Sequence, residues 1–285
     1  MAKTIGNPLS WTARALGRGG HHLADMAGHI QSHDDAGPPV VRRIDGTDIG
    51  LALRMGLEDF AAFRSDVVFL CLIYPVIGLG LVWAAFNAAL APFIFPMTAG
   101  FALLGPVAAI GLYELSRRRE AGLSASWGDA FELIRSPALG AIILLGAYLL
   151  ALFAAWMGTA YLIFLVTMGP ALPESAMAFL RDAATTPEGW SMILLGVPAG
   201  AVFAGLVLAI SVVAFPLILD RHTGLAVAVA TSLRVTRANP GAVILWGMIV
   251  AVSLAIAAIP FFLGLVVVMP VLGHATWHLY RRAIG

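Results

Sequence analysis

Residues 138–168 read ALGAIILLGAYLLALFAAWMGTAYLIFLVTM and contain neither a charged side chain nor a histidine. A membrane-crossing helix needs about 20 consecutive apolar residues to span a hydrocarbon core roughly 30 Å thick. The rest of the chain has the same character, since 60% of its 285 residues are hydrophobic and 12% are charged. A soluble domain averages about 25% charged residues, because it must cover its surface with polar groups. The sequence therefore predicts an all-α integral membrane protein.

The other apolar blocks set the number of expected crossings. The last block, residues 242–280, contains no Asp, Glu or Lys and is about twice as long as one crossing requires. It is either two helices or one very long helix. Pro260 near its middle favours a reversal at residues 258–262, because proline clashes with the preceding helical turn. We expect a polytopic transmembrane helical bundle of six spans, at residues 67–90, 97–115, 138–168, 192–219, 242–258 and 262–280.

The basic residues alternate between the two sides of this expected bundle. Of the 17 Lys and Arg residues, 16 precede the first span, follow the second or fourth, or follow the last, and Arg181 is the exception. Cytoplasmic loops of membrane proteins are enriched in Lys and Arg, and this bias sets the orientation of the chain. The distribution predicts a multi-pass protein with both termini in the cytoplasm.

Residues 1–43 differ in composition from the rest of the chain. They are rich in Gly, His, Asp and Arg and lack an apolar stretch. Such a segment cannot bury enough apolar surface to offset the entropy cost of ordering. We expect a disordered cytoplasmic tail here, followed by one integral membrane domain at residues 44–285. The histidines of the tail are irregularly spaced, which favours disorder over metal binding.

Three stretches that precede the first, third and fifth spans share a pattern. Residues 50–66, 122–137 and 224–240 each carry apolar residues three or four positions apart. Helices with one apolar face that are too short to cross tend to lie along the membrane surface. The six spans are therefore expected to form three hairpins, each preceded by an amphipathic interfacial helix. The alternative is that the three stretches are ordinary cytoplasmic loops that are helical by default.

Several short motifs occur from residue 45 onward. They include DIGLAL at 48–53, YPVIG at 74–78, GLYELSRR at 111–118 and GHATWHLYRR at 273–282. In these motifs the chain resembles a bacterial family of predicted integral membrane proteins, domain of unknown function 2189. The resemblance implies a protein of the bacterial inner membrane without an agreed activity, and some members of that family carry a cytochrome c oxidase label.

Histidine is scarce in the expected spans, which limits any haem or metal site. Only His274 and His278 occur there, at the cytoplasmic end of the last span. Two imidazoles four residues apart share one helix face, so they cannot bind opposite sides of one haem and supply only half of a Zn or Cu site. No cysteine or carboxylate cluster nearby in the sequence completes that site, so we expect no metal and no cofactor. An interfacial belt is expected instead, formed by His274, Trp277, His278 and Tyr280, with Arg281 and Arg282 reaching lipid phosphates.

Charged residues at the ends of the spans are the remaining candidates for a functional site. Glu114 and Asp220 each end an even-numbered span and lie within three residues of Arg117 or Arg221. Ion pairing at the membrane interface is the expected role, and a transport site is the alternative. If the bundle encloses a cavity, the residues expected near its cytoplasmic mouth are Tyr113, Glu114, Arg117, Asp220, Arg221, His274 and His278.

The chain lacks the motifs of common hydrolases and nucleotide-binding enzymes, such as a GxSxG elbow or a Walker A loop. We therefore expect a protein that is not an enzyme. The leading hypothesis is that it supports a membrane complex or an envelope process by packing against membrane lipids and other membrane helices, without binding nucleic acid. The alternatives are a carrier for an apolar or zwitterionic small molecule and an accessory subunit of a respiratory oxidase.

Overall fold

The computed structural model describes residues 39–85, 88–93, 96–97, 105, 109–124, 126, 128 and 136–285 of the chain. The expected tail up to residue 38 lies outside these residues, as do parts of the expected second span and of the second interfacial stretch. Apart from turns and an isolated β-bridge, the described residues are helical, so the predicted all-α class is confirmed.

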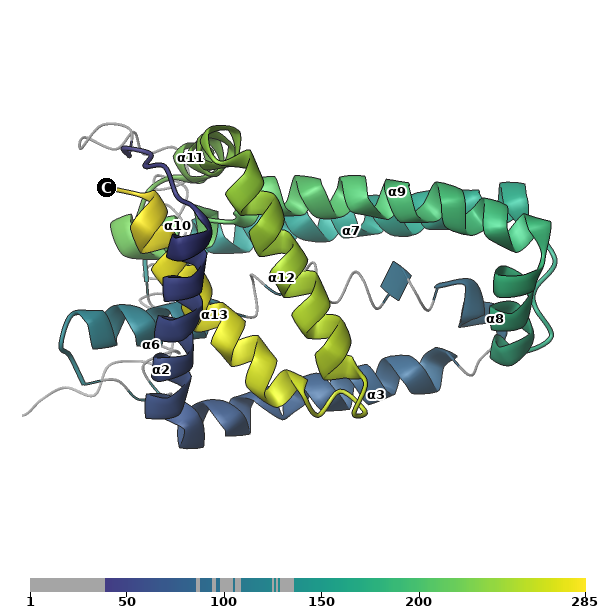
Figure 1. Cartoon of the computed structure of the whole chain (residues 1–285), viewed down its shortest axis with the longest axis horizontal. Helices are drawn as coiled ribbons and strands as arrows, with labels where there is room; N and C mark the ends of the chain where they lie inside the picture. The colour runs from purple at the N-terminus through teal and green to yellow at the C-terminus, as the bar shows by residue number, and fades with distance from the viewer. Residues whose placement is uncertain are drawn as a thin grey trace, which may run out of the picture.

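Three described stretches are long and apolar enough to cross a membrane. They are α7 (Leu139–Thr167), the stretch Pro187–Arg221, and α12 (Pro240–Ala258), with mean hydropathies of 2.3, 2.7 and 2.3. The second stretch comprises α9 (Pro187–Ser211) and α10 (Ala214–Arg221). Figure 1 shows α7 and α9 side by side along the longest axis, with α8 (Ala176–Thr185) at the far end.

The first expected interfacial helix and the first expected span meet at a sharp change of direction. Helix α2 (Gly46–Cys71) ends five residues inside the expected span, and α3 (Ile73–Ala85) follows it. Pro75 lies in the first turn of α3, where the missing backbone N–H of proline is tolerated. The same proline cannot continue a preceding helix, so α2 ends before it. In Figure 1, α2 lies across the direction of α7 and α9, whereas α3 runs along it.

The last apolar block forms two helices with a reversal between them. Helix α12 ends at Ala258 and α13 (Leu265–Ala283) begins seven residues later, so a break is present where Pro260 predicted one. Phe261 and Phe262 in this turn have positive φ angles of 52° and 63°, which side-chain-bearing residues rarely adopt. The ring of Phe262 lies against Gly78 of α3, where an added Cβ would come within 2.5 Å of it.

Two further helices, α6 and α11, lie with α10 at one end of the bundle (Figure 1). Helix α6 (Ile110–Glu120) carries Arg117, Arg118 and Arg119, and α11 (Leu225–Ala238) occupies the third expected interfacial stretch. Helices therefore occupy the first and third of these stretches, in α2 and α11, as both interpretations of these stretches predict.

The closest helix pair in the described part of the chain is α2 against α13, which run in opposite directions (Figure 1). We call the interface between α2 and α13 the seam. Ala52 and Ala275 in the seam are 0% exposed, and a methyl group at Gly56 would lie 2.6 Å from the backbone nitrogen of Ala275. Beyond the seam, Val41 pairs with Ile284 in an antiparallel bridge. The last residues of the expected tail thus take part in the folded bundle.

Replacing Gly56 with alanine tests this seam. The added methyl group would clash with the backbone of α13 and force the helices apart, so we expect a loss of about 1–3 kcal/mol in unfolding free energy. Gly50 on the same helix has open space around it, so Gly50→Ala should be neutral or stabilising. Thermal unfolding in detergent would measure both variants. Equal melting temperatures for the two would contradict the close approach.

Candidate functional site

The polar residues of α13 are buried in the bundle rather than arranged in an interfacial belt. His274 and Tyr280 are 0% exposed, Trp277 is 1% exposed and His278 is 6% exposed. The predicted belt is therefore wrong. Aromatic and imidazole side chains combine an apolar body with a polar tip, so they also suit a buried seam in which each tip finds a partner. Here those partners come from α2, α6 and α10.

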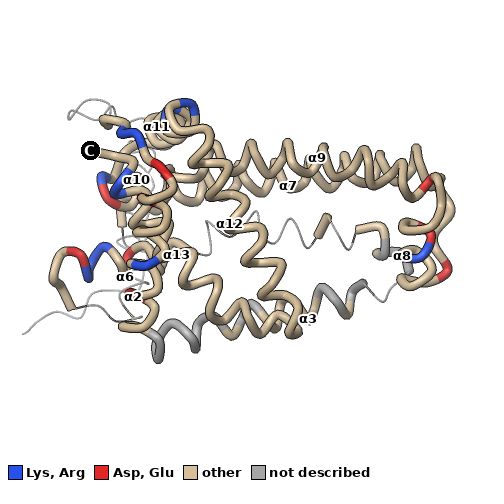
Figure 2. The backbone as a smooth tube through the Cα atoms, viewed as in Figure 1, with Lys and Arg blue, Asp and Glu red and all other residues tan. Residues whose placement is uncertain are grey.

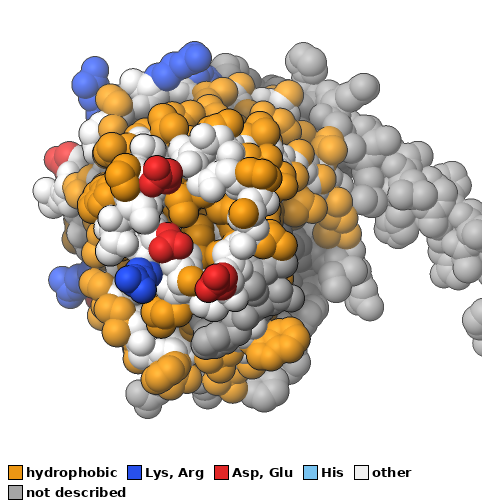
Figure 3. Space-filling model, turned by 90° about the vertical axis from the view of Figure 1, so that its right-hand side faces the viewer, with side chains coloured by type: hydrophobic (Ala, Val, Ile, Leu, Met, Phe, Trp, Pro, Cys, Tyr) orange, Lys and Arg blue, Asp and Glu red, His pale blue; other side chains and the backbone are white. Residues whose placement is uncertain are grey.

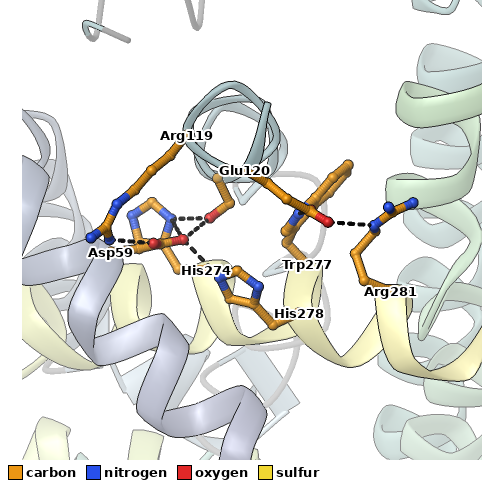
Figure 4. Close-up of polar contacts among 8 residues, drawn as sticks. Asp59, Arg119, Glu120, His274, Trp277, His278 and Arg281 are labelled. Atoms are coloured by element: carbon orange, nitrogen blue, oxygen red, sulfur yellow. Dashed lines mark hydrogen bonds and ion pairs between the residues drawn. The ribbon is translucent and has the colours of Figure 1, made fainter. Parts of the chain in front are cut away.

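The centre of this seam is the carboxylate of Asp59 on α2, whose side chain is 6% exposed. Its Oδ2 accepts a hydrogen bond from Ser116 Oγ at 2.5 Å and lies 2.8 Å from His278 Nε2. Its Oδ1 pairs with the guanidinium of Arg119. Figure 4 shows these side chains converging from α2, α6 and α13. A buried carboxylate is costly unless each oxygen is paired, and both oxygens of Asp59 are.

The protonation of the two imidazoles follows from this geometry. An ionised carboxylate only accepts, so His278 Nε2 must carry the hydrogen that it shares with Asp59. Ser116 gives its hydrogen to Asp59, so His274 Nδ1, 2.7 Å from Ser116 Oγ, must donate to the serine. In neutral His274 the other nitrogen, Nε2, is then a bare acceptor, and it is buried without a partner in the described part of the chain.

The same contacts keep Asp59 charged. Burial raises the pKa of Asp59, but the hydrogen bonds from His278 and Ser116 lower it, and the net pKa lies below the ordinary value of 3.8. Asp59 is therefore a carboxylate at neutral pH. We call the residues Asp59, Ser116, Arg119, His274 and His278 the Asp59 cluster.

Further along α13, three more side chains bind carboxylates of other helices. Trp277 Nε1 donates to Glu120 Oε2 at 2.9 Å, and Arg281 Nε donates to Glu120 Oε1 at 2.9 Å (Figure 4). Arg282 Nη1 lies 2.8 Å from Asp48 Oδ1. Arg281 and Arg282 thus bind carboxylates of α6 and α2 instead of reaching for lipid phosphates, which corrects that expectation.

The predicted ion pair of Glu114 is confirmed, and that of Asp220 has a different partner. Arg117 binds Glu114 through two hydrogen bonds of 2.8 and 2.7 Å. Asp220 accepts from the hydroxyl of Tyr280 at 2.7 Å and lies 3.4 Å from Arg281 Nη1. Arg221 instead donates to the backbone oxygen of Gly285 at 2.7 Å. Asp220 is therefore bound to α13 across the helix interface and not to the neighbouring Arg221.

The seven predicted site residues fall into separate contacts in the structure. His274 and His278 meet in the Asp59 cluster, and Glu114 with Arg117 forms a local pair on α6. Asp220 and Arg221 lie at the end of α10, and Tyr113 is 2% exposed on α6.

Sequence reasoning missed Asp59, Ser116, Arg119 and Glu120. A signal for Asp59 exists in α2: Ala52, Gly56 and Asp59 recur at spacings of four and three, and all three are buried. A carboxylate on a line of small residues marks a face where another helix approaches closely and supplies donors. Within the described residues, no group of three or more His, Cys, Asp or Glu is arranged to hold a metal ion.

The charge distribution and the apolar helices define the class of protein. Figure 2 shows Lys, Arg, Asp and Glu gathered at two ends, one at α6, α10 and α11 and the other at α8, with uncharged helices between them. Figure 3 looks onto the α8 end, where acidic and basic side chains lie among hydrophobic ones. Helices of crossing length between two polar ends define an integral membrane protein.

The family comparison agrees with this class. The family model described as Predicted integral membrane protein (DUF2189) matches residues 94–220, so the predicted family resemblance is confirmed. No curated protein and no solved structure matches the chain. The matched range includes Ser116, Arg119 and Glu120, whereas Asp59 and the histidines of α13 lie outside it.

Substitution of Asp59 tests whether the cluster holds the helices together. Asp59→Asn removes the charge that Arg119 and His278 face, and we expect a loss of about 2 kcal/mol, because hydrogen bonds to charged groups contribute roughly 1.5–3 kcal/mol. Glu58→Gln is the matched control, since Glu58 is exposed and pairs with Arg54 on the same helix. It should change the unfolding free energy by less than about 0.5 kcal/mol. Chemical unfolding in detergent micelles measures both, and similar small effects would contradict a central role for Asp59.

Proposed function

We propose that the protein is a non-enzymatic component of the bacterial inner membrane that supports a membrane complex or an envelope process. In this proposal the chain crosses the membrane six times, as three hairpins preceded by interfacial helices, with both termini in the cytoplasm. The observation that carries the proposal is the commitment of the polar residues of α13 to carboxylates of α2, α6 and α10. These pairs fix helices, which is what a scaffold requires.

The distribution of charge supports the proposed topology. The arginines of α6, α11 and α13 lie at the end where Val41 and Ile284 pair, so both described chain ends share the basic side of the bundle (Figure 2). The opposite end carries Arg181 together with acidic residues around α8. The positive-inside bias assigns the basic end to the cytoplasm.

The outer surfaces of the crossing helices support contacts with lipids or partner helices. Large apolar side chains are exposed along α7, α9 and α12, for example Val166 at 76%, Leu194 at 69% and Ile244 at 65%. In water such surfaces would aggregate, whereas in a bilayer they face acyl chains or other apolar helices.

A carrier for an apolar or zwitterionic small molecule is the second candidate. Pro198 lies inside α9 and Pro270 inside α13, and prolines within membrane helices remove a backbone hydrogen bond and allow kinks. The scaffold has stronger support, because the titratable residues of the Asp59 cluster are bound to one another.

Reporter fusions test the proposed topology. A reporter placed after Glu120 and one placed after Gly285 should both be active in the cytoplasm, whereas one placed before α8, after Leu172, should be active outside. The reason is that the first two sites follow an even number of crossings and the third follows an odd number. Opposite locations for the first two reporters would contradict the six-span arrangement.

Co-purification tests the scaffold role. Full-length protein extracted gently from native membranes should retain a partner in a fixed ratio. Asp59→Asn should release that partner by loosening the helices that present the apolar faces, and Glu58→Gln should retain it. Protein that is monodisperse and free of partners, yet drives solute uptake after reconstitution into liposomes, would support the carrier instead.

A further inference from the structure

A pocket of about 350 Å³ lies where the start of α2 meets the start of α12. Its walls are residues 43–46 on one side, and residues 238–242 with Leu245 on the other. Asn239, which is 5% exposed, fixes this junction. Its side-chain oxygen accepts from the amide of Ile44 at 2.9 Å, and its side-chain nitrogen donates to the carbonyl of Arg42 at 3.0 Å. Hydrogen bonds therefore hold the two walls in place.

Two exposed side chains of opposite charge, Arg43 and Asp45, line this pocket. Asp45 Oδ1 accepts from the backbone amides of Thr47 and Asp48 at 2.8 and 3.1 Å, which caps the start of α2. Among the described residues, Arg43 forms no ion pair and Asp45 has no basic partner, whereas nearby Asp48 is already bound to Arg282. The pocket thus offers one cation and one anion, neither of which has an ion-pair partner among the residues that the structure describes.

The apolar edge of the pocket continues along α12. Leu245 on its rim is 45% exposed, and Met248, Val252 and Ile256 are 58%, 50% and 60% exposed. Spacings of three and four residues place these side chains on one helix face. At a rise of about 1.5 Å per residue, the stripe from Leu245 to Ile256 is about 17 Å long. Half of a hydrocarbon core is roughly 15 Å thick, so the stripe has the length of one leaflet.

We propose that this pocket binds the headgroup of a zwitterionic glycerophospholipid, with its phosphate at Arg43, its ammonium group at Asp45 and an acyl chain along α12. A site with Arg43 alone would prefer an anionic lipid, since that lipid carries a net negative charge. Asp45 reverses this preference, because it repels additional negative charge and attracts an amine. The apolar stripe that leads away from the pocket selects a lipid over a soluble zwitterion of the same charge pattern.

Native mass spectrometry of the full-length protein tests the proposal. The protein is released from nanodiscs that contain phosphatidylethanolamine and phosphatidylglycerol in equal amounts, and the retained lipid is identified. Wild-type protein should retain one phosphatidylethanolamine in preference to phosphatidylglycerol by roughly fivefold, the effect of one exposed ion pair. Arg43→Gln should lose both lipids. Asp45→Asn, which keeps the helix cap, leaves Arg43 as the charged group of the pocket and should reverse the preference, so that phosphatidylglycerol is retained over phosphatidylethanolamine.

Arg181→Gln is the matched control, because Arg181 is an exposed arginine of α8, which lies at the opposite end of the bundle. It should retain lipids as the wild-type protein does. Equal retention of the two lipids by wild-type protein would overturn the proposal, as would unchanged selectivity in Asp45→Asn. Displacement of the lipid by soluble glycerophosphoethanolamine at similar concentration would show that the acyl stripe contributes nothing, and would also overturn it. None of these outcomes depends on whether a protein partner is found.

Discussion

Asp59 carries a carboxylate that is almost completely shielded from solvent, and the cost of burying that charge determines what must surround it. Three hydrogen-bond donors from two other helices offset this free-energy cost: Ser116 and Arg119 on α6, and His278 on α13. Each donor can reach Asp59 only if α6 and α13 both lie against α2. The charge therefore specifies one arrangement of three helices, where apolar packing alone would tolerate several.

Close packing of backbones makes this arrangement possible. Gly56 and Ala52 on α2 allow α13 to approach until backbone atoms nearly touch, and Asp59 follows on the same face. From that position α13 extends its polar side chains to other carboxylates, through Trp277 to Glu120 and through Tyr280 to Asp220. Small residues and polar residues thus act together, because the small residues bring the helices close enough for the polar side chains to bind carboxylates of neighbouring helices.

The parts of the structure that the sequence predicts are those encoded by neighbouring residues. Long apolar runs predicted α7, α9 and α12, and a spacing of three residues within one helix predicted the ion pair of Glu114 with Arg117. The partners of Asp59 lie 57 and 219 positions away in the chain, at Ser116 and His278, and no local pattern reports such contacts. The interfacial belt failed for a related reason: the same aromatic and imidazole residues suit a membrane surface or a buried seam, and only the position of α2 and α6 decides between them.

The two ends of the hairpin formed by α12 and α13 are stabilised by different interactions. At the basic end, ion pairs such as that of Arg282 with Asp48 are partly exposed and are screened by dissolved salt. At the turn, Phe262 holds a backbone conformation that costs about 1–2 kcal/mol for a residue with a side chain, and it lies on Gly78 of α3 through shape alone. Rising ionic strength would therefore weaken the exposed ion pairs at the basic end, whereas the buried Asp59 cluster and the contact between Phe262 and Gly78 would keep α13 in place.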